Sequence, residues 1–177
     1  LLKNKINKQT KILNYNELVS YLKTSKSNLS LLAISGYNSL DYLSIIFQNT
    51  KNLGLVNKEC VVSAGHLFKK MIKKYKTNIF PLDSEHFSIS SNIKNFNSTH
   101  LKKIFITASG GPFYKRNIST FNKISFKEAT NHPKWSMGYK NSIDSATLAN
   151  KCLEIIEAKY LFNIPFEKIG VVIHPES

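Results

Sequence analysis

Short apolar runs alternate with amphipathic segments through the first half of the chain. The spacing of the apolar residues predicts helices after Asn16, after Ser39 and from Val61 to Tyr75. Strands are predicted around these helices, at residues 11–14, 29–35, 53–56 and 78–82. This alternation is typical of βαβ units, so we expect part of a doubly wound α/β domain with a parallel sheet.

The character of the sequence changes after Leu82, where a polar stretch rich in Ser and Asn begins. Beyond it, apolar runs predict strands at 103–107 and 169–173, and the strongest helical pattern runs from Ser145 to Phe162. Residues 114–140 are predicted to form a long loop with one short helix, and such loops often cover binding sites. The predicted division is therefore an α/β domain at 1–82 and an α+β domain at 83–177.

The formal charge of +14 suggests a nucleic-acid partner, but the composition argues against one. Arg116 is the only arginine among 25 basic residues, whereas base recognition relies on the bidentate guanidinium group. The lysines are also spread along the chain and do not form one stripe. No apolar stretch approaches the roughly 20 residues of a membrane-spanning helix. We therefore expect neither a nucleic-acid partner nor a membrane partner.

Cys60 and Cys152 lack the spacing of a zinc site, so a reduced, cytoplasmic setting is expected. The first residues contain no apolar signal-peptide core, and the chain does not open with Met. Both ends are therefore expected to be cuts within a longer protein.

Two carboxylates, Asp83 and Glu85, lie two residues apart at the end of a predicted strand. In extended geometry they would project from the same side and could bind a hard divalent cation such as Mg²⁺ or Mn²⁺. An acidic pair at a strand end is, however, more often solvated or part of a helix cap. A metal site would need a third oxygen ligand from elsewhere in the chain.

The predicted helix at 145–162 offers that third ligand. Asn150, Lys151 and Glu154 fall within one arc of roughly 100°, which makes a polar patch. Glu157 lies close to the same arc, so the helical geometry leaves both glutamates as candidates. An exposed Lys–Glu pair without a ligand would give the same pattern.

Ser109-Gly110-Gly111 follows a predicted buried strand, where small residues let backbone N–H groups approach an anion. An ordinary tight turn would have the same composition. In the following loop, His132 and Trp135 supply an imidazole and an indole, and the indole must either cover a ligand or pack on the core. No partner pattern marks three other histidines, which are expected to be structural or surface residues: His66, His86 and His100.

An ordered set of short motifs runs through the chain from Gly36 onward. It consists of Asn57-Lys58-Glu59, Val62 to Gly65, Pro81 to His86, Thr107 to Phe113, His132 to Gly138, Ile143 to Thr147, Asn150-Lys151, Glu154 to Phe162 and Ile173 to Pro175. In its order and spacing, this set resembles the 1-deoxy-D-xylulose 5-phosphate reductoisomerase family. Residues 1–35 match that family only in their pattern of strand and helix.

The resemblance implies roles for particular residues. The metal ligands would be Asp83, Glu85 and Glu154. The substrate contacts would be Ser84, Ser109, His132, Trp135, Ser145, Asn150 and Lys151. The catalytic residues would be Lys151, Glu85 and His132. The nicotinamide cofactor would lie beside Asn57, Lys58 and Glu59. Residues 110–138 would form a mobile flap, with Trp135 as its cover.

The resemblance also implies an activity. Such an enzyme uses NADPH and Mn²⁺ or Mg²⁺ to convert 1-deoxy-D-xylulose 5-phosphate to 2-C-methyl-D-erythritol 4-phosphate, in non-mevalonate isoprenoid precursor synthesis. It would combine a Rossmann-like NADPH domain at 1–82 with a catalytic domain at 83–177, and the full-length protein would be a homodimer. Two alternatives are another Rossmann-type NAD(P)-dependent oxidoreductase and a non-catalytic basic binding module.

Some residues depart from the family pattern. Cys60 and Cys152 stand where the family usually has Ser and Gly, and the sequence from His86 to Ser90 is unusual. The family's glycine-rich dinucleotide fingerprint, which lies further upstream, is missing from these 177 residues. The 177 residues alone are therefore expected to be inactive.

Overall fold

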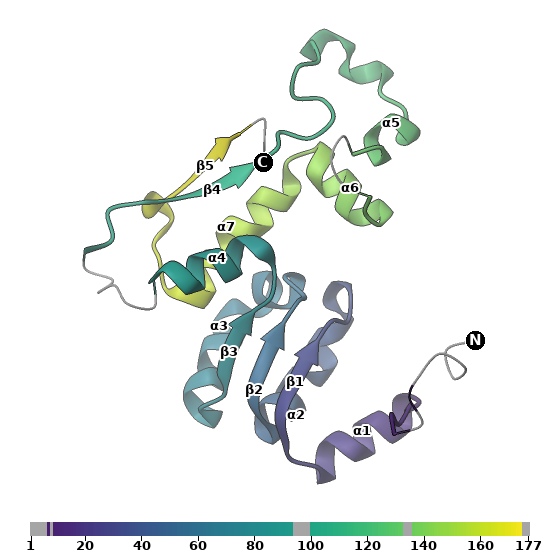
Figure 1. Cartoon of the computed structure of the whole chain (residues 1–177), viewed down its shortest axis with the longest axis vertical. Coiled ribbons are helices and arrows are strands. Elements are labelled where there is room, and N and C mark those ends of the chain that lie inside the picture. The colour runs from purple at the N-terminus through teal and green to yellow at the C-terminus, as the bar shows by residue number, and fades with distance from the viewer. Residues whose placement is uncertain (1–6, 8, 94–99, 133–135, 175–177) are drawn as a thin grey trace.

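The computed structural model describes residues 7, 9–93, 100–132 and 136–174. A three-stranded parallel sheet forms its first layer (Figure 1), with strands in the order β1-β2-β3. The strands are β1 (Ser27–Leu32), β2 (Thr50–Leu55) and β3 (Asn78–Pro81). The accompanying helices are α1 (Tyr15–Thr24), the 3₁₀ turn η2 (Gly36–Ser39), α2 (Leu40–Asn49) and α3 (Glu59–Tyr75). The predicted α/β class is confirmed.

The strand predicted at 11–14 is wrong, because Asn14 caps a helix instead. The Asn14 side chain accepts a hydrogen bond from the Glu17 backbone N–H at 3.0 Å. The Glu17 carboxylate in turn accepts one from the Asn14 N–H at 2.7 Å. This reciprocal capping box satisfies two backbone donors, and α1 therefore starts at Tyr15, ahead of the cap predicted at Asn16.

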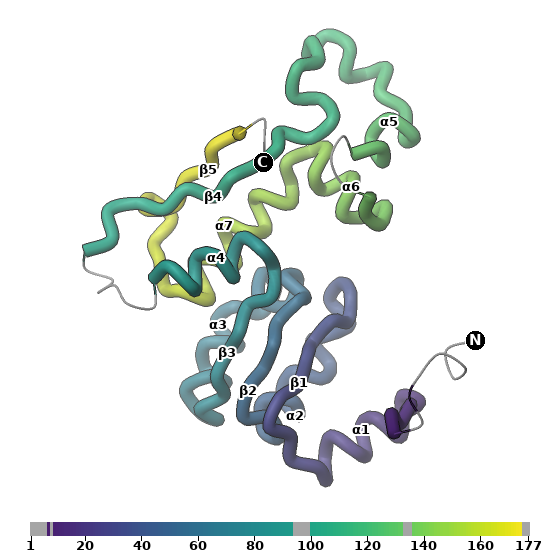
Figure 2. Tube along the Cα trace, viewed as in Figure 1, coloured from purple at the N-terminus to yellow at the C-terminus, as the bar shows by residue number. Residues whose placement is uncertain are grey.

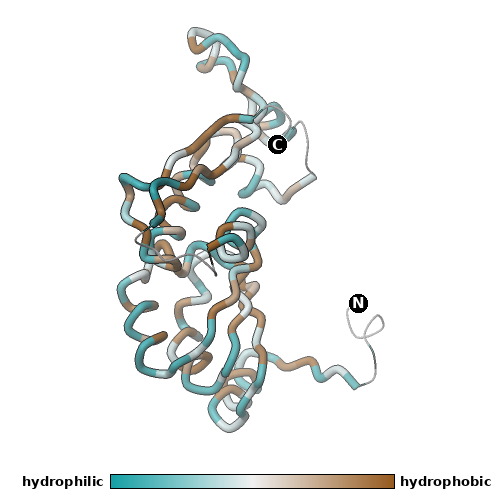
Figure 3. The backbone as a smooth tube through the Cα atoms, turned by 60° about the vertical axis from the view of Figure 1, so that its left-hand side comes forward, coloured by the Kyte–Doolittle hydropathy of each residue, from teal (hydrophilic) through white to brown (hydrophobic). Residues whose placement is uncertain are grey.

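Helices α2 and α3 cover one face of the three-stranded sheet, the face turned away from the viewer in Figure 1. Phe47 of α2 and Phe68 of α3 meet edge to face, with ring centroids 5.0 Å apart, and both belong to a buried cluster that includes Leu53 and Leu55 of β2. Figure 3 shows that hydrophobic segments also run through the half of the molecule that does not contain this sheet. Burial of the apolar side chains of α2, α3 and β2 supplies the main driving force for folding of this first layer.

A second layer contains a two-stranded parallel sheet of β4 (Ile104–Ala108) and β5 (Ile169–Ile173), so the two strands predicted there are confirmed. Helix α4 (Ser84–Ile93), helix α7 (Ala149–Phe162) and the 3₁₀ turn η5 (Phe166–Lys168) accompany it. In the trace of Figure 2, α4 and α7 lie between the two sheets. Ala158 of α7 is fully buried in the second core cluster, with Ile106 and Ile164.

Helix α7 also packs closely against α3 of the first layer. A Cβ atom added to Gly65 would lie 2.3 Å from the Tyr160 ring, so glycine is what allows the two helices to approach. Tyr160 and Leu161 pack against the first core cluster, whereas Ile155 and Phe162 pack against the second. One helix therefore belongs to both cores.

The helix predicted from Ser145 to Phe162 is interrupted. The first of its residues belong to α6 (Tyr139–Ala146), and α7 begins at Ala149. Between them Leu148 has φ 60°, a left-handed conformation that costs a non-glycine residue roughly 1–2 kcal/mol. The predicted stop is confirmed, because Asn163 ends α7 with φ 56°.

The region predicted as a long loop is more ordered than expected. It contains the 3₁₀ helix η4 (Ile118–Lys123), α5 (Phe126–Thr130) and the start of α6. Arg116 links η4 to α5, since its guanidinium donates to Glu128 of α5 at 2.6 Å and to the Thr120 hydroxyl of η4 at 3.1 Å. None of the helices in the described part of the chain is long and apolar enough to cross a membrane.

Candidate functional site

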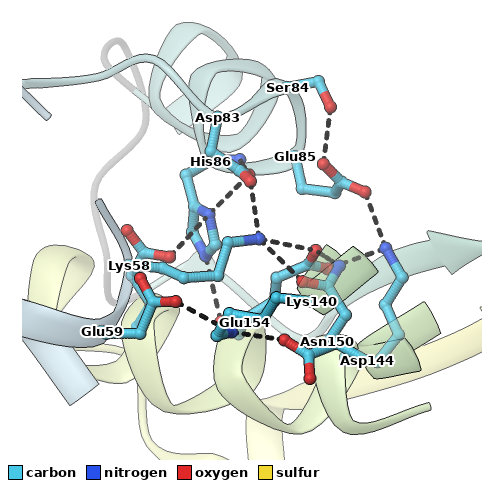
Figure 4. Close-up of polar contacts among 12 residues, drawn as sticks. Lys58, Glu59, Asp83, Ser84, Glu85, His86, Lys140, Asp144, Asn150 and Glu154 are labelled. Atoms are coloured by element: carbon cyan, nitrogen blue, oxygen red, sulfur yellow. Dashed lines mark hydrogen bonds and ion pairs between the residues drawn. The ribbon is translucent and has the colours of Figure 1, made fainter. Parts of the chain in front are cut away.

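Three carboxylates meet between β3, α4 and α7. Asp83 follows β3, Glu85 lies in the first turn of α4, and Glu154 lies in the middle of α7. Each offers one oxygen atom, and the three oxygens all lie within 4.8 Å of one another. Figure 4 shows Asp83 and Glu85 extending from α4 and its start toward the helix that carries Glu154.

The acidic pair reaches this site from a helix start, so the extended geometry predicted for Asp83 and Glu85 is wrong. The Asp83 carboxylate accepts a hydrogen bond from the His86 backbone N–H at 3.3 Å. It thereby helps to satisfy the open backbone donors at the start of α4. Turn geometry then aims Glu85 at α7.

Two lysine ammonium groups lie among the carboxylates, and Figure 4 labels one of them, Lys58. Lys58 Nζ lies 3.0 Å from Asp83 Oδ2 and 3.4 Å from Glu154 Oε1. Lys151 Nζ lies 2.6 Å from Glu85 Oε1 and 2.7 Å from Glu154 Oε2. The Asn150 side-chain amide donates a further hydrogen bond to Glu154. Glu154 is therefore a fully buried carboxylate between two positive charges.

The surroundings shift the pKa of each carboxylate differently. Burial alone would raise the pKa of Asp83, but hydrogen bonds and charge from His86 and Lys58 hold it well below its usual range. Burial is likewise outweighed at Glu85, whose pKa is lowered by Lys151 and Ser84. At Glu154, burial prevails and raises the pKa. Among these three carboxylates, Glu154 is thus the one whose ionised form its surroundings favour least.

The three carboxylates fit a hard divalent cation. Mg²⁺ binds oxygen at about 2.1 Å, so two oxygens on opposite sides of it are about 4.2 Å apart. The three carboxylate oxygens lie within 4.8 Å of one another, which is close to that spacing. Three carboxylates also outnumber the two ammonium groups beside them, which leaves net negative charge for a cation.

A pocket of about 460 Å³ opens beside this cluster. It is lined by all three carboxylates and by six of the predicted substrate contacts, namely Ser84, Ser109, His132, Ser145, Asn150 and Lys151. The seventh, Trp135, lies outside the described residues. Thr107, Met137 and Asn141 also line the pocket and were not among the predicted site residues.

Another part of the pocket lining comes from the end of β4 and the segment after it. The Ser109 hydroxyl lies 3.3 Å from His132 Nε2, within hydrogen-bonding distance. Burial lowers the pKa of His132, which favours its neutral form. Thus Ser109 and His132, 23 positions apart, contact each other in the lining of the same pocket as the carboxylates.

Of the three residues predicted beside the nicotinamide, only Lys58 lines the pocket. Asn57 is buried and its side chain supports the backbone, accepting from the Cys60 N–H at 2.7 Å and donating to the Gly36 carbonyl at 2.9 Å. Glu59 pairs with Lys140 of α6 at 2.8 Å. Cofactor contact by these residues stays a prediction.

His86 was expected to be structural or on the surface, and it is fully buried, in contact with one of the three carboxylates. Its Nδ1 is 2.9 Å from Asp83 Oδ1 and 3.3 Å from Glu157 Oε2. Glu157 is also buried, and burial raises its pKa to about 7 against the opposing effect of His86. The spacing Asp-x-x-His at a helix start was the sequence signal for this contact.

Gly111 is required by the close approach of two segments at the pocket edge. Its φ is +70°, and an added Cβ would lie 2.7 Å from the Ser145 carbonyl oxygen. We expect Gly111→Ala to lower the free energy of unfolding by about 1–3 kcal/mol. Gly138→Ala, where nothing lies within 4 Å of the new Cβ, should cost less than about 1 kcal/mol. Denaturant unfolding of the full-length protein compares them, and equal losses would contradict the assigned role of Gly111.

Comparison with known proteins identifies the family of this chain. Residues 79–162, which contain the three carboxylates, match the model of the 1-deoxy-D-xylulose 5-phosphate reductoisomerase C-terminal domain. A protein of that name from Pelagibacter ubique is 44% identical over 181 residues, which cover 100% of this chain. The chain belongs to the 1-deoxy-D-xylulose 5-phosphate reductoisomerase family. The resemblance read from its motifs is confirmed.

Other reductoisomerases extend the comparison. One from Clostridium kluyveri is 52% identical over 130 residues, covering 73% of this chain and 34% of the relative. A reductoisomerase crystal structure in complex with NADPH, fosmidomycin and magnesium superposes with a TM-score of 0.82 at 40% identity, covering 93% of this chain and 43% of that one. The Zymomonas mobilis enzyme in complex with NADPH gives 0.81 at 36% identity, covering 92% of this chain and 41% of that one.

The chain spans only part of these reductoisomerases. It covers 47% of the Pelagibacter ubique protein and 34% of the Clostridium kluyveri protein. The activity of a whole reductoisomerase therefore enters below as a proposal.

Proposed function

We propose that the protein containing this chain is an NADPH- and divalent-metal-dependent reductoisomerase. It converts 1-deoxy-D-xylulose 5-phosphate to 2-C-methyl-D-erythritol 4-phosphate. The observation that carries the proposal is the meeting of Asp83, Glu85 and Glu154 in the lining of one pocket. A reductoisomerase structure holding NADPH and magnesium superposes on this chain, which supports both cofactors.

Asp83, Glu85 and Glu154 are the proposed ligands of Mg²⁺ or Mn²⁺, cations that favour carboxylate oxygens. The bound cation would act as a Lewis acid on the hydroxy-ketone oxygens of the substrate. Lys151 is proposed to bind the phosphate or to neutralise a developing oxyanion. Its position in the pocket, beside Glu85 and Glu154, lets it reach substrate at the carboxylate wall.

The remaining pocket residues are proposed to orient the sugar phosphate. The hydroxyls of Ser84, Ser109 and Ser145, with Asn150, offer donors and acceptors on several sides of the pocket. His132 completes the wall, and Trp135 is proposed as the cover of a flap at 110–138 that excludes water. In such a pocket one carbon–carbon bond breaks by retroaldol cleavage and another forms by aldol addition. Bound NADPH would supply the hydride that reduces the resulting aldehyde carbon, and the aldehyde oxygen would gain a proton.

The proposal also assigns a separate binding role to each half of the chain. Residues 1–82 would contribute to NADPH binding, with Asn57, Lys58 and Glu59 near the nicotinamide, and residues 83–177 would hold the cation and substrate. We further propose that the full-length protein is a cytoplasmic homodimer. The parallel sheet of the first layer and its superposition on NADPH-bound relatives support the first assignment.

The test is turnover by the full-length protein with 1-deoxy-D-xylulose 5-phosphate, NADPH and Mn²⁺. We expect a loss of reduced-nicotinamide absorbance that stops on chelation and returns with Mn²⁺, and NMR should identify a branched product. An unbranched sugar-alcohol phosphate would support another NAD(P)-dependent oxidoreductase instead. No oxidation of NADPH at all would favour a non-catalytic module and overturn the proposal.

A further inference from the structure

His86 is held at both ends of its imidazole ring. Nε2 lies 3.0 Å from the Glu154 backbone carbonyl, and because a carbonyl only accepts, Nε2 must carry the proton that is shared there. At the other end, Nδ1 faces Asp83 Oδ1 at 2.9 Å and Glu157 Oε2 at 3.3 Å. The ring also stacks near Phe162, with centroids 6.2 Å apart and planes 20° apart. His86 thus has a fixed position behind the carboxylate cluster.

This contact decides which way Asp83 points. Its Oδ1 is held by the His86 ring and backbone, while its Oδ2 faces Lys58 at 3.0 Å, on the side of the other carboxylates. A carboxylate held by one oxygen presents the other in a defined direction. The direction of the second oxygen therefore depends on the ring of His86.

Apart from this ring, nothing near Glu157 in the described residues explains a buried carboxyl group at this position. It is 1% exposed, and its Oε2 has no well-directed hydrogen bond among the described residues. Its neighbours on α7 include the core residues Ile155 and Ala158, so an apolar side chain would suit the position. Burying a carboxylate without a strong partner is costly, and the nearby nitrogen is His86 Nδ1.

We propose that Glu157 is a positioning residue that holds the imidazole of His86, which in turn orients Asp83 for cation binding. The inference rests on the proposed function, because it assigns Asp83 to the cation. Glu157 lies one helical turn after Glu154, so α7 supplies one ligand directly and orients a second one through α4. Loss of a residue that hydrogen-bonds to or supports a metal ligand commonly weakens metal binding by about 10–100-fold.

The test measures Mn²⁺ affinity of the full-length protein by electron paramagnetic resonance of free Mn²⁺. Glu157→Leu should weaken binding by about 10–100-fold. Glu157→Gln keeps a side-chain oxygen beside Nδ1 without the negative charge, so it should still hold the ring and keep affinity to within about threefold of the natural protein. NADPH affinity, followed by fluorescence, should stay unchanged in both. Ile155→Val, a small change on the same helix, serves as the control for altered packing.

The outcomes separate two failures. Absence of Mn²⁺ binding by the natural protein would overturn the proposed function. Tight binding by both the natural protein and Glu157→Leu would overturn only the positioning role. Equal weakening by Gln and Leu would also overturn it, since the charge of Glu157, and not the contact of its oxygen with the His86 ring, would then set the affinity. If Glu157→Leu does not fold, Glu157→Met offers a flexible apolar side chain for the same comparison.

Discussion

Glu154→Gln in the full-length protein should weaken Mn²⁺ binding by more than about 100-fold, because a lost ligand should exceed the 10–100-fold effect of supporting residues. The amide has nearly the shape of the carboxylate, so the fold should remain. It lacks the negative charge that faces Lys58 and Lys151, and that would face the cation. Turnover of 1-deoxy-D-xylulose 5-phosphate should fall with Mn²⁺ affinity.

Calorimetric titration with Mn²⁺ and steady-state kinetics measure the two effects. Glu167→Gln makes the same chemical change at an exposed side chain and should alter neither. Unchanged Mn²⁺ affinity in Glu154→Gln would remove Glu154 from the ligand set. Circular dichroism of both variants shows whether folding is preserved.

Lys151→Ala should raise the Michaelis constant for the sugar phosphate by about 10–150-fold, which corresponds to a charge-assisted contact of about 1.5–3 kcal/mol. NADPH affinity should change little. Mn²⁺ affinity should not fall, because the ammonium now 2.6 Å from Glu85 and 2.7 Å from Glu154 competes with a cation for these oxygens. This combination of effects distinguishes a substrate contact from a metal-site support.

Lys159→Ala provides the matched control for that variant. Lys159 lies on the same helix but sits 3.9 Å over the Phe166 ring, away from the carboxylates. Its removal should leave all three affinities unchanged. If Lys151→Ala weakened substrate and NADPH equally, or neither, Lys151 would not belong to the phosphate site.

Most strands could be predicted from the sequence because buried parallel strands are short apolar runs, and β2 to β5 lie close to the predicted places. One error arose where a tertiary contact decides the local conformation. The break at Leu148 accompanies the approach of Gly111 to Ser145, a contact between segments far apart in sequence. The strand expected at 11–14 failed for a local reason, the capping box that Asn14 forms with Glu17.

The candidate site was predicted unevenly. Helical periodicity placed Glu154 and Glu157 on nearly the same arc and could not separate them, whereas the family resemblance selected Glu154 as the ligand. The structure shows both buried, with Glu154 facing the lysines and Glu157 facing His86. Packing of α4 against α7 gives Glu154 and Glu157 these different neighbours. The periodicity of a single helix cannot predict a contact with another helix.

The membership of α7 in both hydrophobic cores limits how modular this protein can be. A cut at residue 83, where the sequence suggests a domain boundary, would separate Tyr160 from Gly65 and uncover the side of α7 that faces α3. The same helix carries Glu154 and Lys151. Recombining the first layer with a foreign second layer would therefore need a compatible α3 surface as well as a suitable pocket, so the two halves are expected to have changed together during evolution.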